Sequence, residues 1–346
     1  MWKEEVDGCF YQNHLHRLRA LNGRINPQFA IYWFQYAFDA ANLYFGRGNV
    51  TTIPNLSRSR LAELPMPLPE LAEQQKIAYV LSVVQRAMEQ QERLIQTTTE
   101  LKKALMQKLF TEGTRGEPQK QTEIGPVPKN WDVKRLDEIT DGFQYGTSVK
   151  CSYETDGPPV LRIPNVVGGH LDTSDIKFGN PKPNELEKLP LKYGDLLFVR
   201  TNGVKANAGR CSMYRDEFDV ECFYASYLIR VRLDPKKLNP AFLDEYSRTT
   251  AGISFLAGQA IRTADGKFNI NSGTLQRMLV AVPDPTEQTK IAKAAAVVDR
   301  KKQIHVDKLK GLSDLIKTLL HKLMTAEIRV HDIDLPGFAE YLKNVN

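Results

Sequence analysis

The sequence contains the same segment twice, and this repeat limits what the chain can fold into. Residues 55–111 align without a gap with residues 269–325, and 17 of the 57 aligned positions are identical. The shared positions include Pro69 and Pro283, and a Glu-Gln pair that begins four residues after each. A repeat of this length exceeds the roughly 20–50 residues of a solenoid unit. It therefore indicates duplication of a domain together with a helix, and two similar surfaces.

The repeat continues upstream with a shift of one residue. The matching residues are Cys9-Phe10-Tyr11 with Cys222-Phe223-Tyr224, Arg17 and Arg19 with Arg230 and Arg232, and Asn26-Pro27 with Asn239-Pro240. The second copy extends back to about Trp131, whereas eight residues precede Cys9. We therefore expect the chain to begin inside its first copy. Either the first domain is truncated, or its beginning lies on another chain.

Each copy ends in a segment with the heptad pattern of a coiled coil. Apolar residues recur at alternating spacings of four and three, which is typical of a helical seam sustained over several heptads. The seam residues are Ile77, Leu81, Val84, Met88 and Ile95 in the first copy, and Ile291, Val298, Leu309, Leu312, Ile316, Leu319 and Leu323 in the second. Asp284 is expected to cap the second helix, with Pro285 at its first position. We expect the two helices to pair antiparallel, the alternative being that each packs on its own domain.

The segment between the helices predicts a linker and a globular domain. Glycines and prolines gather in residues 113–130. Apolar runs predict strands at 160–163, 195–200, 227–233 and 278–282, and helices are expected at 240–249 and 273–277. The predicted organisation is a partial domain over 1–68, a helix over 69–112, a linker over 113–130, a complete domain over 131–283, a helix over 284–326 and a tail over 327–346. The fold class is α+β, with mixed-sheet domains joined by two long helices that form an antiparallel coiled coil.

Composition excludes several classes of protein. The 42% hydrophobic and 25% charged residues are ordinary for a globular protein. No apolar run approaches the roughly 20 residues of a membrane span, and the first residues lack the apolar core of a signal peptide. The four cysteines form no Cys-x-x-Cys pair, so neither a disulfide framework nor a zinc site is expected. These features predict a cytoplasmic protein that is not bound to a membrane, and a net charge of +6 permits nucleic-acid binding.

The sequence predicts no catalytic site and no metal site. Pro283-Asp284 with Glu287 and Lys290 resembles a nuclease motif, but the spacing is wrong and these residues open a helix. The Asn-Pro pairs at Asn26 and Asn239 lack the second proline of an amino-methyltransferase loop. His305 lies on the seam, where a packing role is expected. We therefore predict a protein that is not an enzyme and holds no cofactor of its own.

Three loops of the complete domain have the composition of a DNA-binding surface. Arginine, asparagine and threonine hydrogen-bond phosphates and base edges, and aromatic residues accompany them in one loop. The candidates are Gln144, Tyr145, Thr147 and Lys150 in the first loop, Arg200, Thr201, Asn202, Lys205, Asn207 and Arg210 in the second, and Arg262, Thr263 and Lys267 in the third. Each loop alone is also compatible with an ordinary solvated turn.

Together these motifs resemble one family. Four segments are similar to the conserved regions of Type I restriction–modification specificity subunits. They are Pro69 with Glu73-Gln74, its second copy at Pro283, the run Pro128-Lys129-Asn130-Trp131, and the run from Tyr193 to Arg200. The resemblance covers nearly the whole chain. It implies two target-recognition domains held apart by an antiparallel coiled coil, each reading one half of a split, asymmetric DNA site.

The resemblance also implies partners. Such subunits are not enzymes, but bind double-stranded DNA and dock two methyltransferase subunits and restriction subunits. S-adenosylmethionine, ATP and Mg are then expected only on those partners. The sequence departs from the family at its start, because the counterpart of residues 131–218 is missing from the first copy. The alternatives are a truncated or silent allele with one working domain, self-association or completion by another chain, or a coiled-coil adaptor that binds protein.

Overall fold

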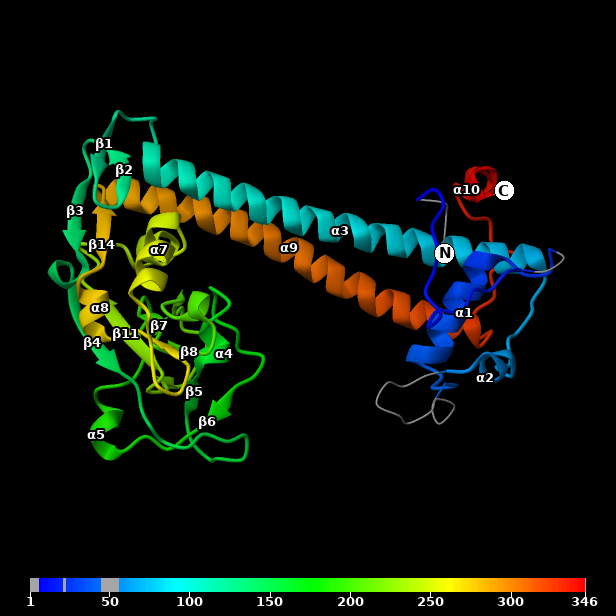
Figure 1. Cartoon of the computed structure of the whole chain (residues 1–346), viewed down its shortest axis with the longest axis horizontal. Coiled ribbons are helices and arrows are strands. Elements are labelled where there is room, and N and C mark those ends of the chain that lie inside the picture. The colour runs from blue at the N-terminus through cyan, green and yellow to red at the C-terminus, as the bar shows by residue number, and fades with distance from the viewer. Residues whose placement is uncertain (1–5, 21–22, 45–55, 346) are drawn as a thin grey trace. The chain divides into compact units, whose positions relative to one another are not determined.

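The computed structural model describes residues 6–20, 23–44 and 56–345, and the chain forms two compact units (Figure 1). Unit 1 consists of residues 1–97 and 302–346, and unit 2 consists of residues 98–301. Both divisions fall inside the long helices α3 (Leu71–Glu112) and α9 (Pro285–Met324), so each unit contains part of both helices. The predicted linear boundaries, which separate each helix from the domains, stay predictions.

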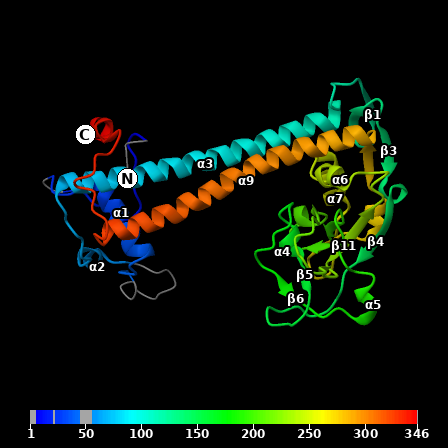
Figure 2. The same ribbon diagram turned by 180° about the vertical axis from the view of Figure 1, so that it is seen from behind.

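Unit 1 is helical in its described residues. Besides its parts of α3 and α9 it contains α1 (Pro27–Asp39), α2 (Arg58–Ala62) and α10 (Phe338–Val345). Figures 1 and 2 show the last part of α9 beside the first part of α3. One core joins the three longest helices, and its members are Phe29, Tyr32, Trp33 and Ala37 of α1, Ile77, Ala78 and Leu81 of α3, and Leu320, Leu323 and Met324 of α9. The helix α1 therefore packs against the paired helices.

Unit 2 contains five small sheets. Its strands are β1 (Gln119–Thr122), β2 (Gly125–Pro128), β3 (Asp132–Arg135), β4 (Thr140–Tyr145), β5 (Pro159–Leu161), β6 (Lys177–Phe178), β7 (Leu196–Val199), β8 (Thr201–Asn202), β9 (Cys211–Met213), β10 (Phe223–Tyr224), β11 (Leu228–Leu233), β12 (Ile261–Arg262), β13 (Phe268–Asn269) and β14 (Leu279–Val282). The strand orders are β1-β2, β10-β5-β6, β4-β11-β7-β9, β12-β13-β8 and β14-β3. Strand β5 pairs with β10 in parallel and with β6 antiparallel, which confirms the mixed sheet.

Short helices connect these strands. They are α4 (Ile163–Val166), α5 (Pro183–Leu186), α6 (Pro240–Tyr246), α7 (Thr250–Gln259) and α8 (Ser272–Gln276), with 3-10 turns η1 (Leu136–Glu138) and η2 (Lys205–Asn207). All four predicted strands and both predicted short helices are confirmed within two or three residues. The segment 113–130 differs from its prediction as a linker, because it forms the β1–β2 hairpin. Val127 of this hairpin is buried in the main core, which fixes the hairpin to the domain.

The sheet β4-β11-β7-β9 is buried on both faces. Along β7, Leu196 and Phe198 belong to one core, while Leu197 and Val199 belong to another. Successive side chains of a strand point to opposite faces, so a strand between two cores needs an unbroken apolar run. The first of these cores also contains Met106 and Phe110 of α3 and Ile291 of α9. The two long helices are therefore part of the unit 2 core.

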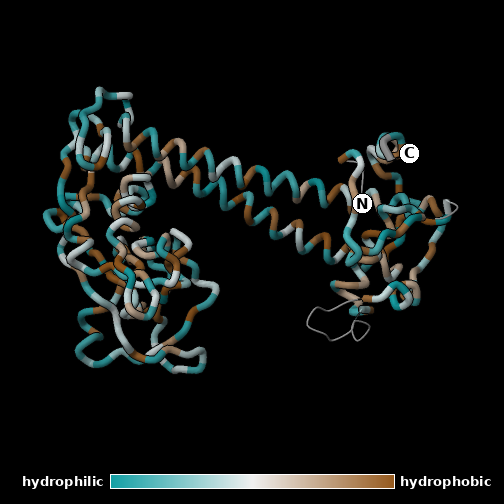
Figure 3. Tube along the Cα trace, in the orientation of Figure 1, coloured by the Kyte–Doolittle hydropathy of each residue, from teal (hydrophilic) through white to brown (hydrophobic). Residues whose placement is uncertain are grey.

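The antiparallel pairing of α3 and α9 is present within each unit. In unit 1, His305 Nδ1 and Gln91 Oε1 lie 2.8 Å apart, and in unit 2 the Lys102 ammonium donates to Asp299 at 2.7 Å. All the predicted seam residues are buried or half-buried. Figure 3 shows hydrophobic and hydrophilic residues alternating along both helices. Gln91 and His305 occupy the same position in the two copies, and such a polar seam pair fixes register at a cost in stability.

The same set of hydrogen bonds, here called the clasp, ties the start of each long helix to the unit that contains that start. In unit 1, the Gln74 side chain accepts from the Asn26 N–H at 2.8 Å and donates to the Pro69 carbonyl at 2.8 Å. In unit 2, the Gln288 side chain accepts from the Asn239 N–H at 2.7 Å and donates to the Pro283 carbonyl at 2.9 Å. Both glutamines are buried. A buried amide with both ends satisfied holds the helix start in one orientation.

The glutamate beside each glutamine has a different partner segment. Glu287 is buried and accepts from the Thr114 N–H at 2.7 Å and the Trp131 indole N–H at 3.1 Å. Glu73 accepts two bonds from the Arg329 guanidinium, at 3.2 and 2.7 Å. Thr114 follows the end of α3 and Arg329 follows the end of α9. Each glutamate therefore binds the start of one helix to the segment that leaves the other.

The helix starts and ends have clear local causes. The Asp284 carboxylate accepts from the Thr286 and Glu287 N–H groups at 2.8 and 3.0 Å, and α9 begins at Pro285, which confirms the predicted cap. Gly113, at φ +67°, follows the last residue of α3. A Cβ on it would lie 3.0 Å from a Glu287 carboxylate oxygen, so glycine suits both the left-handed conformation and the close approach.

The two copies differ sharply at one matched segment. In unit 2, Phe223 is 1% exposed and lies in β10, paired with β5. Its counterpart Phe10 in unit 1 is 95% exposed. In unit 2, Arg232 binds Asp195 at 2.6 Å, whereas the equivalent Arg19 forms no ion pair among the described residues. The part of the domain that covers this segment in unit 2 has no counterpart among the described residues of unit 1.

We expect the substitution Gln288→Met to lower the free energy of unfolding of unit 2 by about 1–3 kcal/mol, because it leaves the Asn239 N–H and the Pro283 carbonyl buried and unpaired. Urea titration followed by the fluorescence of buried Trp131 measures this change. The control is Gln121→Met in unit 2, where the glutamine is exposed on strand β1. Equal losses in the two variants would contradict the clasp.

We expect the Glu73–Arg329 pair to make stability depend on pH. The hydrogen bonds from Arg329 hold the pKa of Glu73 below its ordinary value of 4.5. The folded pKa is the lower one, so the stabilisation is complete above about pH 4.5 and is lost as pH falls through the folded pKa. The stability difference between wild type and Glu73→Gln should therefore be largest near pH 7 and shrink in acid. Denaturant titrations at pH 7, 5 and 3.5 measure it, with Glu92→Gln on α3 as control. A pH-independent difference would rule out the ion pair.

Candidate DNA-binding surface

Two of the three predicted loops are joined by a small sheet. Strand β8 comes directly after Arg200, and its Asn202 lies opposite Phe268 of β13. Phe268 in turn lies opposite Arg262 of β12. Residues directly opposite each other in antiparallel strands share a face. Asn202, Phe268 and Arg262 therefore form one row across the sheet, although 60 residues separate Asn202 from Arg262.

The first loop reaches the same place through an aromatic contact. The Arg200 guanidinium lies over the Tyr145 ring, 4.9 Å from its centroid. The Tyr145 hydroxyl donates to Ser272 Oγ at 3.3 Å and accepts from the Ser272 N–H at 3.0 Å. Tyr145 ends β4, Arg200 follows β7 and Ser272 begins α8. Side chains from all three predicted loops or their borders thus meet at one end of the central sheet.

Some of the predicted contact residues are not accessible in this structure. Thr147 is 1% exposed and its hydroxyl donates to Glu185 at 2.9 Å, so we remove it from the candidate set. Gly146 beside it packs against the backbone of Tyr224, where a Cβ would lie 2.1 Å from the carbonyl oxygen. Gln144 and Lys150 are exposed. No contact among the described residues links Lys150 to the other candidates.

Other predicted residues hold the loops in shape. The Asn202 side chain accepts from the Val204 N–H at 2.9 Å, and Asn207 donates to the same oxygen at 3.5 Å. The Arg210 Nε–H donates to the Ala206 carbonyl at 3.2 Å. The Thr263 hydroxyl lies 2.9 Å from the Lys267 carbonyl across a turn that has Gly266 at φ +82°. These contacts fix loop geometry, which places the neighbouring exposed side chains.

Some of the cations on this surface form ion pairs with carboxylates and others do not. Lys267 is exposed but lies 2.9 Å from Asp265, whose pKa is lowered to about 2 by the Thr263 hydroxyl and the Lys267 ammonium. Lys267 is therefore paired at neutral pH. Arg200, Lys205 and Arg262 form no ion pair with a carboxylate among the described residues. These three carry the local positive charge.

The sequence missed one exposed aromatic residue here. The Tyr227 carbonyl accepts from the Arg200 N–H at 2.9 Å, and the Tyr227 side chain is 57% exposed. It lies at the start of a segment predicted to be a strand, so its side chain was assigned to the sheet. Its place beside a loop arginine only appears once β7 and β11 are paired. A second exposed apolar residue, Ile261, lies on the small sheet β12-β13-β8.

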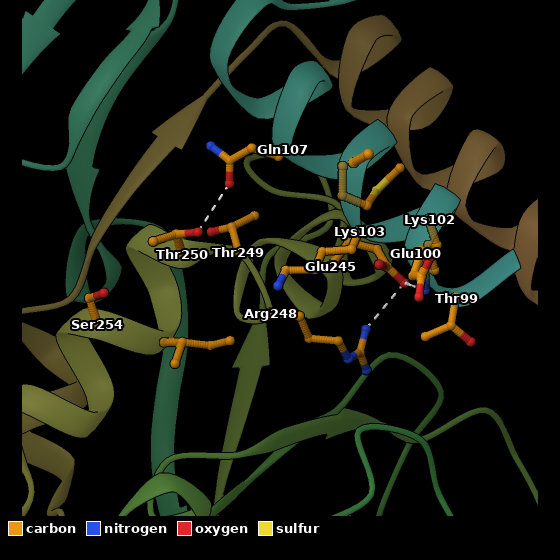
Figure 4. Close-up of a pocket in the computed structure, with 13 residues that line it drawn as sticks. Thr99, Glu100, Lys102, Lys103, Gln107, Glu245, Arg248, Thr249, Thr250 and Ser254 are labelled. Carbon is orange, nitrogen blue, oxygen red and sulfur yellow. Dashed lines mark hydrogen bonds and ion pairs between the residues drawn. The ribbon is translucent and has the colours of Figure 1, made fainter. Parts of the chain in front are cut away.

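Unit 2 also has a hollow between α3 and helices α6 and α7, with a volume of about 700 Å³ (Figure 4). Glu245 accepts from Lys102 at 2.9 Å and from Arg248 at 3.1 Å, and Thr250 donates to Gln107 at 3.1 Å. Lys102 also binds Asp299. The ion pairs of Lys102 and Arg248 with Glu245 therefore tie the globular part of unit 2 to α3.

Over the residues that the structure describes, no group of three or more histidine, cysteine, aspartate or glutamate side chains could hold a metal ion. In the same residues, no helix is long and apolar enough to cross a membrane. Cys211 and Cys222 are buried, and burial raises the pKa of both thiols. The four cysteines are not in disulfides.

Comparisons with known proteins agree with this architecture. Residues 3–99 match the family model "Type I restriction modification DNA specificity domain". The chain is 25% identical over 293 residues to the EcoKI specificity subunit of Escherichia coli, a match covering 82% of this chain and 62% of that protein. It is also 25% identical over 287 residues to the MjaVIII specificity subunit of Methanocaldococcus jannaschii, covering 82% of this chain and 67% of the relative. The chain thus spans about two thirds of the length of these relatives.

A solved structure shares the fold. The Type I restriction–modification S subunit from M. genitalium superimposes with a TM-score of 0.53 at 18% identity, covering 87% of this chain and 73% of that one. At this identity the likeness concerns the fold alone. It supports the α+β class with two long helices.

Proposed function

We propose that the chain is a specificity subunit of a Type I restriction–modification system and that it recognises DNA for such an enzyme; the match of residues 3–99 to the family model and the similarity to the EcoKI specificity subunit support this. The observation that carries the proposal is the meeting of three predicted DNA-binding loops around Arg200 in unit 2. Its uncompensated arginines can contact phosphates or bases, and the row on β12-β13-β8 can follow a groove. The site is split and asymmetric in this proposal, with unit 2 reading one half.

Partner subunits supply the chemistry in this proposal. The chain docks two methyltransferase subunits and, through them, restriction subunits. S-adenosylmethionine, ATP and Mg then belong to those partners, and this chain acts as a non-catalytic subunit in the cytoplasm. The paired helices are the proposed spacer between the two recognition surfaces, and the Glu-Gln pairs at their starts hold each helix to its own unit.

The function is tested by mapping methylated adenines in cells that carry this chain and its neighbouring methyltransferase. A split motif that disappears when the gene is deleted is the expected result. A map without such a motif, combined with the absence of salt-sensitive DNA binding, would favour the coiled-coil adaptor, which binds protein. A motif with a single defined half would support a subunit with one working domain.

We expect Arg262→Ala to weaken DNA binding by the assembled enzyme and to flatten its salt dependence. Each lost phosphate contact should reduce the slope of log K against log salt by about 0.9. Fluorescence anisotropy between 50 and 200 mM salt measures this slope. Arg135→Ala is the matched control, because Arg135 is an exposed arginine on the β14-β3 sheet and is paired with Asp137. Equal slopes for wild type and Arg262→Ala would remove β12 from the interface.

We also propose that, in the active complex, a polypeptide segment with the fold of residues 131–221 covers the exposed segment of unit 1 that contains Phe10, Arg17 and Arg19. Phe10 and Phe223 are matched positions with opposite exposure, which supports this proposal. Arg17 and Arg19 match Arg230 and Arg232, which in unit 2 bind the Pro190 carbonyl and Asp195. The covering segment is therefore expected to bring an acidic group to Arg19.

The matched pair of variants Phe10→Asp and Phe223→Asp tests this covering. Phe223→Asp buries an unpaired charge and should destabilise unit 2 by more than about 3 kcal/mol, whereas Phe10→Asp should change the stability of the chain alone by less than about 0.5 kcal/mol. In the assembled enzyme, Phe10→Asp should weaken recognition of one half-site. Stability comes from urea titration and recognition from methylation maps. Unchanged recognition with Phe10→Asp would contradict the covering.

A further inference from the structure

The Arg200 side chain is restrained by two neighbours. Its guanidinium is 4.9 Å from the centroid of the Tyr145 ring, and one of its N–H groups points to the Ser226 carbonyl at 3.4 Å. The ring itself is fixed, because the Tyr145 hydroxyl makes two hydrogen bonds with Ser272. The Arg200 main chain is bonded on both sides, from its N–H to the Tyr227 carbonyl and from the Ile270 N–H to its own carbonyl. The side chain thus starts from a rigid backbone and lies on a rigid ring.

The charge of Arg200 is not compensated by a carboxylate in the described part of the chain. Five other arginines of unit 2 form ion pairs: Arg135 with Asp137, Arg162 with Asp175, Arg215 and Arg248 with Asp244, and Arg232 with Asp195. Those pairs hold the fold together. Arg200 instead lies over the Tyr145 ring, a contact that restrains the guanidinium and leaves its positive charge for an incoming ligand. Arg230 also lies over a tyrosine ring, but it is buried and its guanidinium donates to the Lys188 and Pro190 carbonyls.

A planar guanidinium in a fixed orientation suits one kind of DNA contact better than others. Two parallel N–H groups match the O6 and N7 acceptors of guanine in the major groove, and this pairing requires the correct plane. A phosphate accepts hydrogen bonds over a wide range of directions, so it does not need the side chain to be fixed in advance. Restraint of Arg200 by Tyr145, which is itself bonded to Ser272, therefore helps a contact with a base but is not needed for a contact with a phosphate.

We propose that Arg200 reads a guanine in the half-site bound by unit 2, and that Tyr145 and Ser272 are positioning residues that hold its guanidinium in the plane of the base pair. This inference rests on the proposed function in DNA recognition. It assigns one base pair of the site to Arg200. Arg262 differs, because its guanidinium forms no cation–π contact among the described residues, although Phe268 lies opposite it in the sheet.

The test uses the full chain assembled with its methyltransferase subunits and a set of duplexes carrying its mapped motif. Each G·C pair in turn is changed to A·T, and each guanine to 7-deazaguanine, which lacks the N7 acceptor. Wild type should lose about 5- to 150-fold in affinity at one guanine of one half-site. In Arg200→Lys, which keeps the charge but lacks the planar pair of N–H groups, discrimination at that guanine should fall below the wild-type value while the salt slope is unchanged. Arg262→Lys is the control and should keep the discrimination.

The positioning role has its own variants. Tyr145→Phe keeps the ring but loses both bonds to Ser272, and Tyr145→Leu loses the ring. Discrimination at the same guanine should fall in the order wild type, Tyr145→Phe, Tyr145→Leu, while affinity for duplexes already changed at that position stays equal. A merely structural role would weaken binding to all duplexes alike. Thermal unfolding of each variant checks that unit 2 remains folded.

The outcomes separate this inference from the proposed function. If wild type binds no motif, the proposed function fails. If wild type binds its motif but Arg200→Lys keeps full discrimination at every guanine, only the reading by Arg200 is overturned. A uniform loss of affinity across all duplexes in Arg200→Lys would also overturn it and would assign Arg200 to a phosphate.

Discussion

The adjacent glutamate and glutamine at the start of each long helix hold the structure together. The glutamine fixes the helix start to the domain that precedes it, through a main-chain N–H and a carbonyl. The glutamate fixes it to the segment that follows the other helix, through Thr114 and Trp131 in unit 2 and Arg329 in unit 1. One pair of neighbouring residues thus binds three parts of the chain. Removing either partner would leave a buried polar group unsatisfied, which makes these contacts costly to lose.

The core of unit 2 depends on this arrangement. The central sheet has a core on each face, and the one containing Leu196 and Phe198 is closed by Met106, Phe110 and Ile291 from the two long helices. The two helices therefore cover one side of this core. Paired charges around Glu245 join α3 to the globular part a second time. A rigid domain of this kind can hold the Arg200 surface at its sheet end, because the loops there start from strands that are buried on both faces.

The two units share sequence but differ in how complete their cores are. The clasp of Gln74 repeats that of Gln288 nearly bond for bond. In contrast, Phe10 is exposed where Phe223 is buried. In unit 1 the contacts of Gln74 run to the helix start and to Asn26 before α1, so they do not depend on the segment around Phe10. That segment is exposed, and no strand among the described residues of unit 1 pairs with it as β5 pairs with β10.

The sequence by itself determined the duplication, the two helices with their seams, the cap at Asp284 and the strands of the second domain. Each of these depends on periodicity or on residues close in the chain, such as the Pro285 that opens α9. Only the tertiary structure decided which loop residues meet. Arg200, Tyr145 and Ser272 come from three distant segments, and their contact follows from strand pairing that no local pattern encodes. The same holds for Thr147, which has the composition of a surface residue but is buried by Glu185, and for Tyr227, whose neighbour is set by the register of β7 and β11. Local chemistry fixes elements, whereas the position of a side chain at a surface depends on how distant elements pack.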